Sequence, residues 1–232
     1  MQRYFTNVKQ GDYLILKEED LYHIKTVMRM KQGDHIEVIY DHKLHICQLD
    51  NNYQAWIKEV KKQLIDKKME YILCVPLLQE QKMSFVLQKA TELGVDKIIP
   101  ILTERSIVRI KEKQEHKLSR WHRICKEASE QAKRLEIPTI EKITKIEDLN
   151  MQGLKIVLST KEKDTTIKKI LKNNLNCDKI IMVVGPEGGL TDFEEKTLNE
   201  LGFVSTSLGN NIMRVETVPI YLLSILNYEL ME

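Results

Sequence analysis

The most constraining stretch of this chain is a short apolar run that ends in a glycine-rich turn. Residues 180–184 (IIMVV) are followed at once by residues 185–189 (GPEGG). An apolar run bounded by glycine and proline is typical of a strand buried on both faces of a parallel sheet. Glycines after such a strand allow a sharp turn and a close approach of a ligand to the main chain. The stretch therefore predicts an α/β sheet with a loop that can hold a ligand.

The following residues predict a helix and a second strand that also ends in glycine. Thr191 and Glu194 have the spacing of a capping box, and Gly202 has the place of a helix-ending residue. The second strand is expected over 203–208 and runs into residues 209–211 (GNN). In open α/β sheets, ligands bind outside the carboxyl ends of strands, so the two loops together indicate one small-molecule site. Either loop alone would more often be an ordinary strand-to-helix turn.

Several classes of protein are excluded by what the sequence lacks. No Gly-Lys-Ser/Thr and no G-x-G-x-x-G is present, which argues against a Walker phosphate loop and a classical dinucleotide fold. The four cysteines form no C-x-x-C pair, so we expect reduced core thiols and no metal site. No apolar run approaches the ~20 residues that span a bilayer, and the N-terminus has no apolar signal core. We therefore expect a cytoplasmic protein without a membrane segment.

The patterns divide the chain into residues 1–68 and residues 71–232. The first part has short strands with tight turns, which suggest a small barrel, and a charged boundary at 61–70. Its expected strands are 13–16, 35–40, 43–49 and 53–60, with a short helix over 19–28. In the second part strands and helices alternate, which predicts a mostly parallel sheet covered on both faces. Its expected strands are 71–75, 95–102, 155–159, 180–184 and 203–208; its helices are 82–93, 115–135, 164–171 with Asp164 as cap, 191–201 and 219–230.

The long helix expected over 115–135 carries a row of charged residues. Arg123, Glu127, Glu130 and Arg134 follow one another at intervals of four, three and four. Such a row is common as ion pairs on a wet helix surface. RNA contact and packing against a second copy are the alternatives, and the spacing does not decide between them.

The stretch VVGPEGGLTDFEE followed by LGNNIMRVET resembles the signature of the SPOUT methyltransferases. Within them it is most similar to the RsmE family, which methylates N3 of a uridine in 16S ribosomal RNA. LQKATELGV, TERS and KEASEQAKR precede it in the family order. The family pattern Leu-Arg-x-Glu-Thr-Ala reads Met-Arg-Val-Glu-Thr-Val here, which keeps its polar residues.

The resemblance implies a fold, a cofactor and a set of binding residues. It implies a SPOUT-type parallel sheet with a C-terminal trefoil knot, preceded by a PUA-like β-barrel that binds RNA, and S-adenosylmethionine as cofactor. The implied cofactor-binding residues are Leu158, Ser159, Thr160, Gly185, Pro186, Glu187, Gly188, Gly189, Leu208, Gly209, Ile212, Met213, Arg214 and Thr217. The implied RNA-binding residues are Arg3, Lys25, Arg29, Arg105, Arg123 and Arg134.

Arg214 and Glu216 are the expected catalytic residues. Uridine N3–H is a weak acid, and a guanidinium is suited to stabilise the negative charge that develops on the ring. Glu187 and Glu216 have an alternative role in orienting the loops. The sequence does not identify the general base; Glu127, Glu130 and water are the candidates.

The implied activity is methylation of uridine 1498 of 16S ribosomal RNA by a homodimer that acts on the small ribosomal subunit. Another RNA base or a ribose 2′-hydroxyl is an alternative target. A non-catalytic RNA-binding or assembly factor with the same fold is a third possibility, which the intact residues of both loops disfavour.

Overall fold

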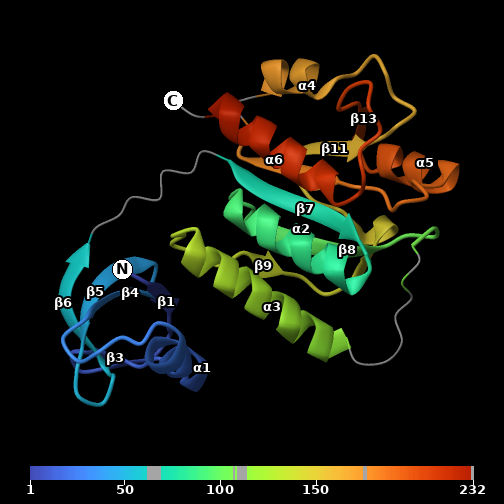
Figure 1. Cartoon of the computed structure of the whole chain (residues 1–232). Helices are drawn as coiled ribbons and strands as arrows, with labels where there is room; N and C mark the ends of the chain where they lie inside the picture. Colours follow the sequence, from blue (N-terminus) through green and yellow to red (C-terminus); the bar gives the residue numbers. More distant parts are fainter. Residues whose placement is uncertain (62–68, 107, 109–113, 175–176, 231–232) are drawn as a thin grey trace. The chain divides into compact units, whose positions relative to one another are not determined.

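The computed structural model describes residues 1–61, 69–106, 108, 114–174 and 177–230 (Figure 1). The chain forms two compact units. The first unit comprises Met1–Asp66 together with Lys126–Ile137, and the second comprises Lys67–Cys125 and Pro138–Glu232. Most of the charged boundary expected at 61–70 lies outside the described residues.

A six-stranded sheet forms the first unit, in the order β1-β4-β5-β6-β3-β2. Its strands are β1 (Arg3–Phe5), β2 (Lys9–Gln10), β3 (Tyr13–Leu14), β4 (His35–Tyr40), β5 (Lys43–Leu49) and β6 (Ala55–Lys61). The bounds predicted for β4 and β5 are confirmed. Asp41 and His42, which join them, have φ angles of 51° and 55°. A two-residue type I′ turn requires positive φ at both positions, and this turn sets the register of the hairpin.

The helix predicted over 19–28 is split into two parts of different type. α1 covers Glu18–Tyr22, and a π-helical turn, η1, covers His23–Val27. Ile24 lies fully buried in the core between these helices and the sheet, with Tyr4, Ile36 and Leu49 among its neighbours in that cluster.

The chain that leaves the long helix also belongs to the first unit. α3 covers Gln114–Gln131, so it ends four residues before the predicted Leu135. Lys133 has a φ of 58°, and the Arg134 N–H donates to the Ser129 carbonyl oxygen over 3.0 Å. This is the geometry of a left-handed helix end, which glycine usually marks. Because no glycine marks this helix end in the sequence, the predicted helix was too long. Arg134 lies beyond the end of α3 and not in the predicted row of charged residues.

A buried ionic cluster holds this segment in the first unit. Lys126 donates to the carboxylate of Asp20, and its Nζ lies 3.4 Å from Glu130 Oε1. Asp20 and Glu130 are only 4% and 8% exposed. Glu130 Oε1 has no hydrogen-bond partner in the described part of the chain. The prediction of a wet ion-pair row is therefore wrong for Glu130, because this carboxylate packs inside the unit.

The second unit contains a parallel sheet in the order β10-β8-β7-β12-β11-β13, with β9 paired to β8. Its strands are β7 (Glu70–Pro76), β8 (Lys97–Leu102), β9 (Thr139–Ile140), β10 (Thr144–Lys145), β11 (Leu154–Leu158), β12 (Lys179–Val183) and β13 (Val204–Thr206). Residues 71–76 of β7 and 180–183 of β12 are buried throughout, as expected for central strands covered on both faces. The predicted parallel α/β sheet is thus confirmed.

Four helices of the second unit follow their strands as predicted, with small shifts at the ends. They are α2 (Glu80–Glu92), α4 (Ile167–Asn174), α5 (Asp192–Glu200) and α6 (Thr217–Leu230). The Thr191–Glu194 capping box is present, and Gly202 follows the helix with a φ of 87°. Asp164 does not cap α4, because the helix begins three residues later and Thr166 Oγ1 accepts the Lys169 N–H there.

Among the described residues, no helix combines the length and apolar character needed to cross a bilayer. In the same part of the chain, no three His, Cys, Asp or Glu side chains gather as a metal site would require. The four cysteines are free thiols, and three of them are buried.

The burial of Glu130 gives the first testable prediction. Burial is the largest influence on Glu130, and with Asp20 and Glu127 nearby it outweighs Lys126 and raises the pKa of this carboxyl from 4.5 to about 7. A raised pKa means that the folded protein prefers the protonated form. Protonated Glu130 makes its full contribution to the free energy of unfolding below pH 4.5, and this contribution is lost as the pH rises through about 7. We expect the free energy of unfolding to fall over this window in the wild type and to fall less in Glu130→Gln, as measured by urea denaturation.

Glu115→Gln, at an exposed position of the same helix, is the matched control and should keep the wild-type pH dependence. An unchanged slope in Glu130→Gln would show that Glu130 does not titrate in this window.

Candidate functional site: a cavity at the carboxyl ends of three parallel strands

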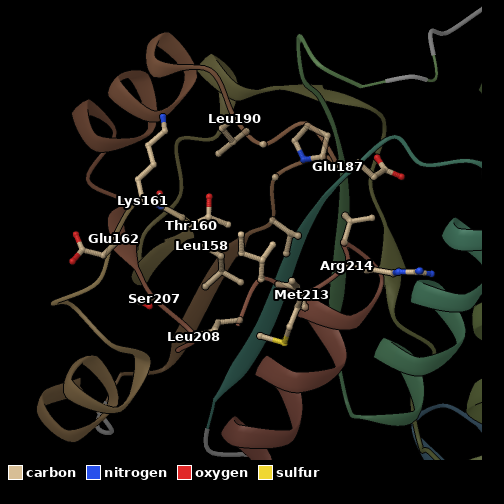
Figure 2. Close-up of a pocket in the computed structure, with 18 of the residues that line it drawn as sticks. Leu158, Thr160, Lys161, Glu162, Glu187, Leu190, Ser207, Leu208, Met213 and Arg214 are labelled. Atoms are coloured by element: carbon tan, nitrogen blue, oxygen red, sulfur yellow. Dashed lines mark hydrogen bonds between the residues drawn. The ribbon is translucent and has the colours of Figure 1, made fainter. Parts of the chain in front are cut away.

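Three loops meet at one edge of the parallel sheet and enclose a cavity of about 910 Å³ (Figure 2). They follow β11, β12 and β13, which are neighbours in the sheet and run in the same direction. Their carboxyl ends therefore lie together, although the loops are far apart in the sequence. Figure 2 shows Leu158, Leu208 and Met213 around the interior of the cavity, so this part of its wall is apolar.

The first loop, residues 184–190, turns tightly after β12. The Gly189 N–H donates to the Pro186 carbonyl oxygen over 2.8 Å, and Gly189 has a φ of 70°. A Cβ at Gly185 would lie 3.3 Å from both the side chain and the backbone nitrogen of Leu190. The glycines are thus required by the turn itself, and they leave main-chain groups accessible at the cavity wall.

The second loop, residues 207–215, forms the opposite wall. Gly209 has a φ of 124°, which disfavours any other residue, and its N–H donates to Ser207 Oγ over 3.2 Å. Ile212 is 84% exposed, which is unusual for a large apolar side chain. Figure 2 shows Arg214 extending away from the apolar interior, toward α2.

The third loop, residues 158–163, is held by the start of α5. Lys161 Nζ donates to Asp192 Oδ1 over 2.6 Å and to Glu195 Oε2 over 3.1 Å, and Ser159 Oγ donates to Glu195. Glu162 Oε1 accepts the backbone N–H groups of residues 163–165, which lower the pKa of this carboxyl. The loop is therefore shaped by polar contacts of residues that line the cavity, and Leu158 is its one apolar residue there.

Four charged side chains gather at the margin nearest α2. Lys82, in the first turn of α2, donates to Glu187 Oε1 over 2.8 Å, and its Nζ lies 3.8 Å from Glu216 Oε2. The hydrogen bond with Glu187 is the main reason why the pKa of Lys82 is raised. Burial opposes ionisation of Glu187, but the contact with Lys82 outweighs it and lowers the pKa of that carboxyl. The margin thus combines two cations, Lys82 and Arg214, with two carboxylates.

Most of the predicted cofactor residues line this one cavity. The predicted residues among its lining are Leu158, Ser159, Thr160, Gly185, Pro186, Glu187, Gly188, Gly189, Leu208, Gly209, Ile212, Met213 and Arg214. Thr217 is not in the lining, since it is already the first residue of α6. Glu216 also lies just outside the lining, against Lys82.

Arg105 has a different place from the one predicted. It follows β8, and its guanidinium donates to the carbonyl oxygens of Gly188 and Leu190 over 3.0 and 3.4 Å. In the same turn, the Glu104 N–H donates to Glu194 Oε1 over 2.8 Å. Arg105 therefore braces the first loop, and its role as an RNA contact stays a prediction.

Arg3 is buried inside the first unit, at 3% exposure, so its prediction as an RNA contact is wrong. Its Nε donates to Glu37 over 2.9 Å, and its Nη1 donates to the carbonyl oxygens of Lys133 and Arg134. The guanidinium is thus used to fix the segment after α3 to the sheet.

The other predicted RNA residues are not in the lining of the cavity. Lys25 and Arg29 are exposed on the first unit, and Lys25 Nζ lies 4.6 Å from the centre of the Tyr53 ring. Arg123 is exposed on α3, and Arg134 is half-buried beyond its end. RNA binding by these four residues stays a prediction.

Several residues of the site escaped the sequence analysis. They are Lys82, Lys161, Leu190, Glu195 and Ser207. Leu190, Glu195 and Ser207 border the predicted loops, so widening those segments by a few residues would have included them. Lys82 and Lys161 carry no local signal, because a lysine near a helix start or in a loop is usually a solvated charge.

Comparison with known proteins agrees with the fold. The sequence pattern of the RNA methyltransferase domain family matches residues 66–227, so the chain belongs to that family. Within it, the chain is 34% identical to ribosomal RNA small subunit methyltransferase E of Mesomycoplasma hyopneumoniae, over 97% of this chain and 98% of the relative. This relationship places it in the ribosomal RNA small subunit methyltransferase E family, in agreement with the RsmE resemblance.

Two solved structures share the whole architecture. A Legionella pneumophila protein described as a methyltransferase with bound cofactor SAM has a TM-score of 0.89 at 28% identity, with 98% of this chain and 97% of that chain covered. The ribosomal RNA small subunit methyltransferase E of Neisseria gonorrhoeae, bound to S-adenosyl methionine, has a TM-score of 0.85 at 26% identity, with coverages of 99% and 98%.

Two arginines of the first unit, Arg3 and Arg29, are expected to give opposite phenotypes when they are replaced. Arg3→Met removes one of the two cations that contact Glu37 and leaves two backbone carbonyl oxygens without this donor. We therefore expect it to lower the free energy of unfolding by about 2 kcal/mol. The exposed Arg29→Met should leave stability unchanged. If Arg29 contacts phosphate, its loss should weaken binding to small ribosomal subunits and reduce the salt dependence of that binding.

Thermal melting and salt-titrated filter binding measure these effects. A stable Arg3→Met protein with weakened RNA binding would reverse the assignment of the two residues.

Proposed function

We propose that this protein transfers the methyl group of S-adenosylmethionine to N3 of uridine 1498 in 16S ribosomal RNA of the small ribosomal subunit. Membership of the ribosomal RNA small subunit methyltransferase E family supports the reaction class. The observation that carries the proposal is the cavity in which both glycine loops converge, with Arg214 and Lys82 at one margin.

The residues of the cavity fit S-adenosylmethionine. Its volume lies within the range of ~300–1,000 Å³ that small-molecule sites occupy. The apolar walls of Leu158, Leu208 and Met213 suit the adenosine part, and main-chain groups of the two glycine loops can bind the polar edges of the cofactor. Thr160 and the backbone near Gly189 complete the wall. When bound, the cofactor supplies the methyl group on a sulfonium, which is already a strong electrophile.

The role of this chain's residues is then orientation and charge stabilisation. We assign to Arg214 the stabilisation of negative charge on the uracil oxygens as N3 loses its proton. Glu216 lies two residues later, with Oε2 buried and without a hydrogen-bond partner in the described part of the chain. This carboxylate is suited to keep Arg214 and Lys82 at the acceptor end of the cavity.

Two finer features of the fold are part of the proposal. One is a PUA-like barrel in the first unit that holds RNA, supported by the six-stranded sheet and by exposed Lys25 and Arg29. The other is a trefoil knot in residues after β11, supported by the position of β12 between β7 and β11 and by the likeness to the Neisseria structure. An experimental trace of residues 154–230 would test the knot.

We further propose that the protein acts as a cytoplasmic homodimer. SPOUT proteins usually complete their site at a dimer interface, and the site described above is built from one chain. Sedimentation equilibrium of the purified protein tests the dimer, and a monomer that turns over normally would refute it.

The decisive experiment measures methyl transfer from labelled S-adenosylmethionine to small subunits that lack the modification. We expect 3-methyluridine at one site by nucleoside mass spectrometry, and less transfer to naked RNA, because one base must be presented in a particular shape. Modification of another base or of a ribose would show that N3 of this uridine is not the target. Cofactor binding without transfer to any RNA would favour an assembly factor.

Arg214→Ala should lower kcat by at least about 100-fold, as loss of a donor that stabilises developing charge does elsewhere. The melting temperature and the affinity for S-adenosylmethionine should stay close to wild type, because the side chain points away from the apolar interior. Arg120→Ala, which removes an arginine that is 60% exposed on α3, is the matched control. Near-normal turnover of Arg214→Ala would remove Arg214 from the mechanism.

A further inference from the structure

Lys82 is a charged residue of the cavity that comes from outside both glycine loops. It comes from the first turn of α2, which begins four residues after β7 ends. Because β7 lies beside β12 in the sheet, this turn reaches the edge at which the glycine loops meet. The side chain lines the cavity and is 33% exposed.

The ammonium group of Lys82 contacts one carboxylate from each loop region. Its Nζ lies 2.8 Å from Glu187 in the first loop and 3.8 Å from Glu216, directly after the second. Their side chains are 31% and 17% exposed, so both carboxylates are partly withdrawn from water. A compact ammonium can serve two carboxylates at once, whereas a planar guanidinium prefers one in a forked arrangement.

The position of Lys82 also bears on Arg214. The two cations are close enough for the charge of Arg214 to oppose ionisation of Lys82. With Lys82 in place, the two carboxylates have their own cation, and the charges of the four side chains cancel. Without it, Glu187 and Glu216 would face Arg214 alone and draw its guanidinium toward themselves.

We propose that Lys82 is a positioning residue for methyl transfer: its ammonium bridges Glu187 and Glu216, ties the two glycine loops together, and leaves Arg214 free to act on the substrate base. This rests on the function proposed above. Lys82 acts through the two carboxylates and through Arg214, and its own contact with the cofactor is not required.

Lys82→Met tests the bridge, because it keeps the length of the side chain and removes its charge. Lys89→Met is the matched control, since Lys89 lies on the same helix, is 34% exposed, and pairs with Glu92 over 2.8 Å, away from the cavity. We expect Lys82→Met to lower kcat by about 100-fold, the order caused by a small misplacement of reacting groups. The affinity for S-adenosylmethionine and the melting temperature should change little in both variants.

Two further readouts separate positioning from a general structural role. The pH profile of Lys82→Met should differ from the wild type on acidification. Glu187 loses the hydrogen bond that lowers its pKa, so it is protonated at a higher pH, and the loss of its charge should restore part of kcat. Adding Glu187→Gln to Lys82→Met should restore part of kcat, since it removes the unpaired carboxylate that competes for Arg214. A double-mutant cycle of the two changes gives the coupling between them.

Hydrogen–deuterium exchange tests the bridge without any need for activity. Lys82→Met should raise exchange in residues 185–190 and 208–214, and Lys89→Met should not. Unchanged exchange in both loops, wild-type kcat, or strictly additive effects in the cycle would each overturn the proposal. A wild-type protein that transfers no methyl group would overturn the proposed function, while the exchange measurement would still decide on the bridge.

Discussion

The site depends on the adjacency of three parallel strands, β12, β11 and β13. Parallel strands point their carboxyl ends to one edge, so the loops over 184–190 and 207–215 come to face one another across β11. Backbone hydrogen bonds of the sheet hold each loop at the end of its strand. The Val184 N–H, for example, donates to the Cys74 carbonyl oxygen of β7. The cavity therefore follows from sheet order, and the loops themselves need little more than glycine and a few apolar side chains.

Glycine loops lack stiffness of their own, and residues from neighbouring elements supply it. Arg105, after β8, holds the carbonyl groups of the first loop, and Lys161 holds the third loop against α5. Both side chains line the cavity, and both are paired, so they shape its wall without adding an unpaired charge. Lys82 contacts Glu187 and Glu216 in the same way at the margin where Arg214 lies.

In the first unit, buried charge joins segments that are distant in sequence. Arg3 joins β1 to the segment after α3, and Lys126 joins α3 to Asp20 in α1. Removal of one partner from such a group costs far more than loss of an exposed pair, because a charge is left buried. The segment KEASEQAKR, for which RNA contact and dimer packing were open, thus has an intramolecular role in Lys126, Glu130 and the carbonyl groups that follow.

The sequence by itself determined the elements that local chemistry controls. Apolar runs gave β7 and β12, the Thr191–Glu194 pair gave the start of α5, and the two glycine loops indicated the ligand site, because each depends on spacing along a few residues. Tertiary structure decided which charges are buried. Arg3 and Arg29 look alike in the sequence, and nothing near Lys82 marks it as a partner of Glu187, 105 residues away. The solvation of a charge depends on what packs against it, and that is set by the order of the strands and not by the residues beside it.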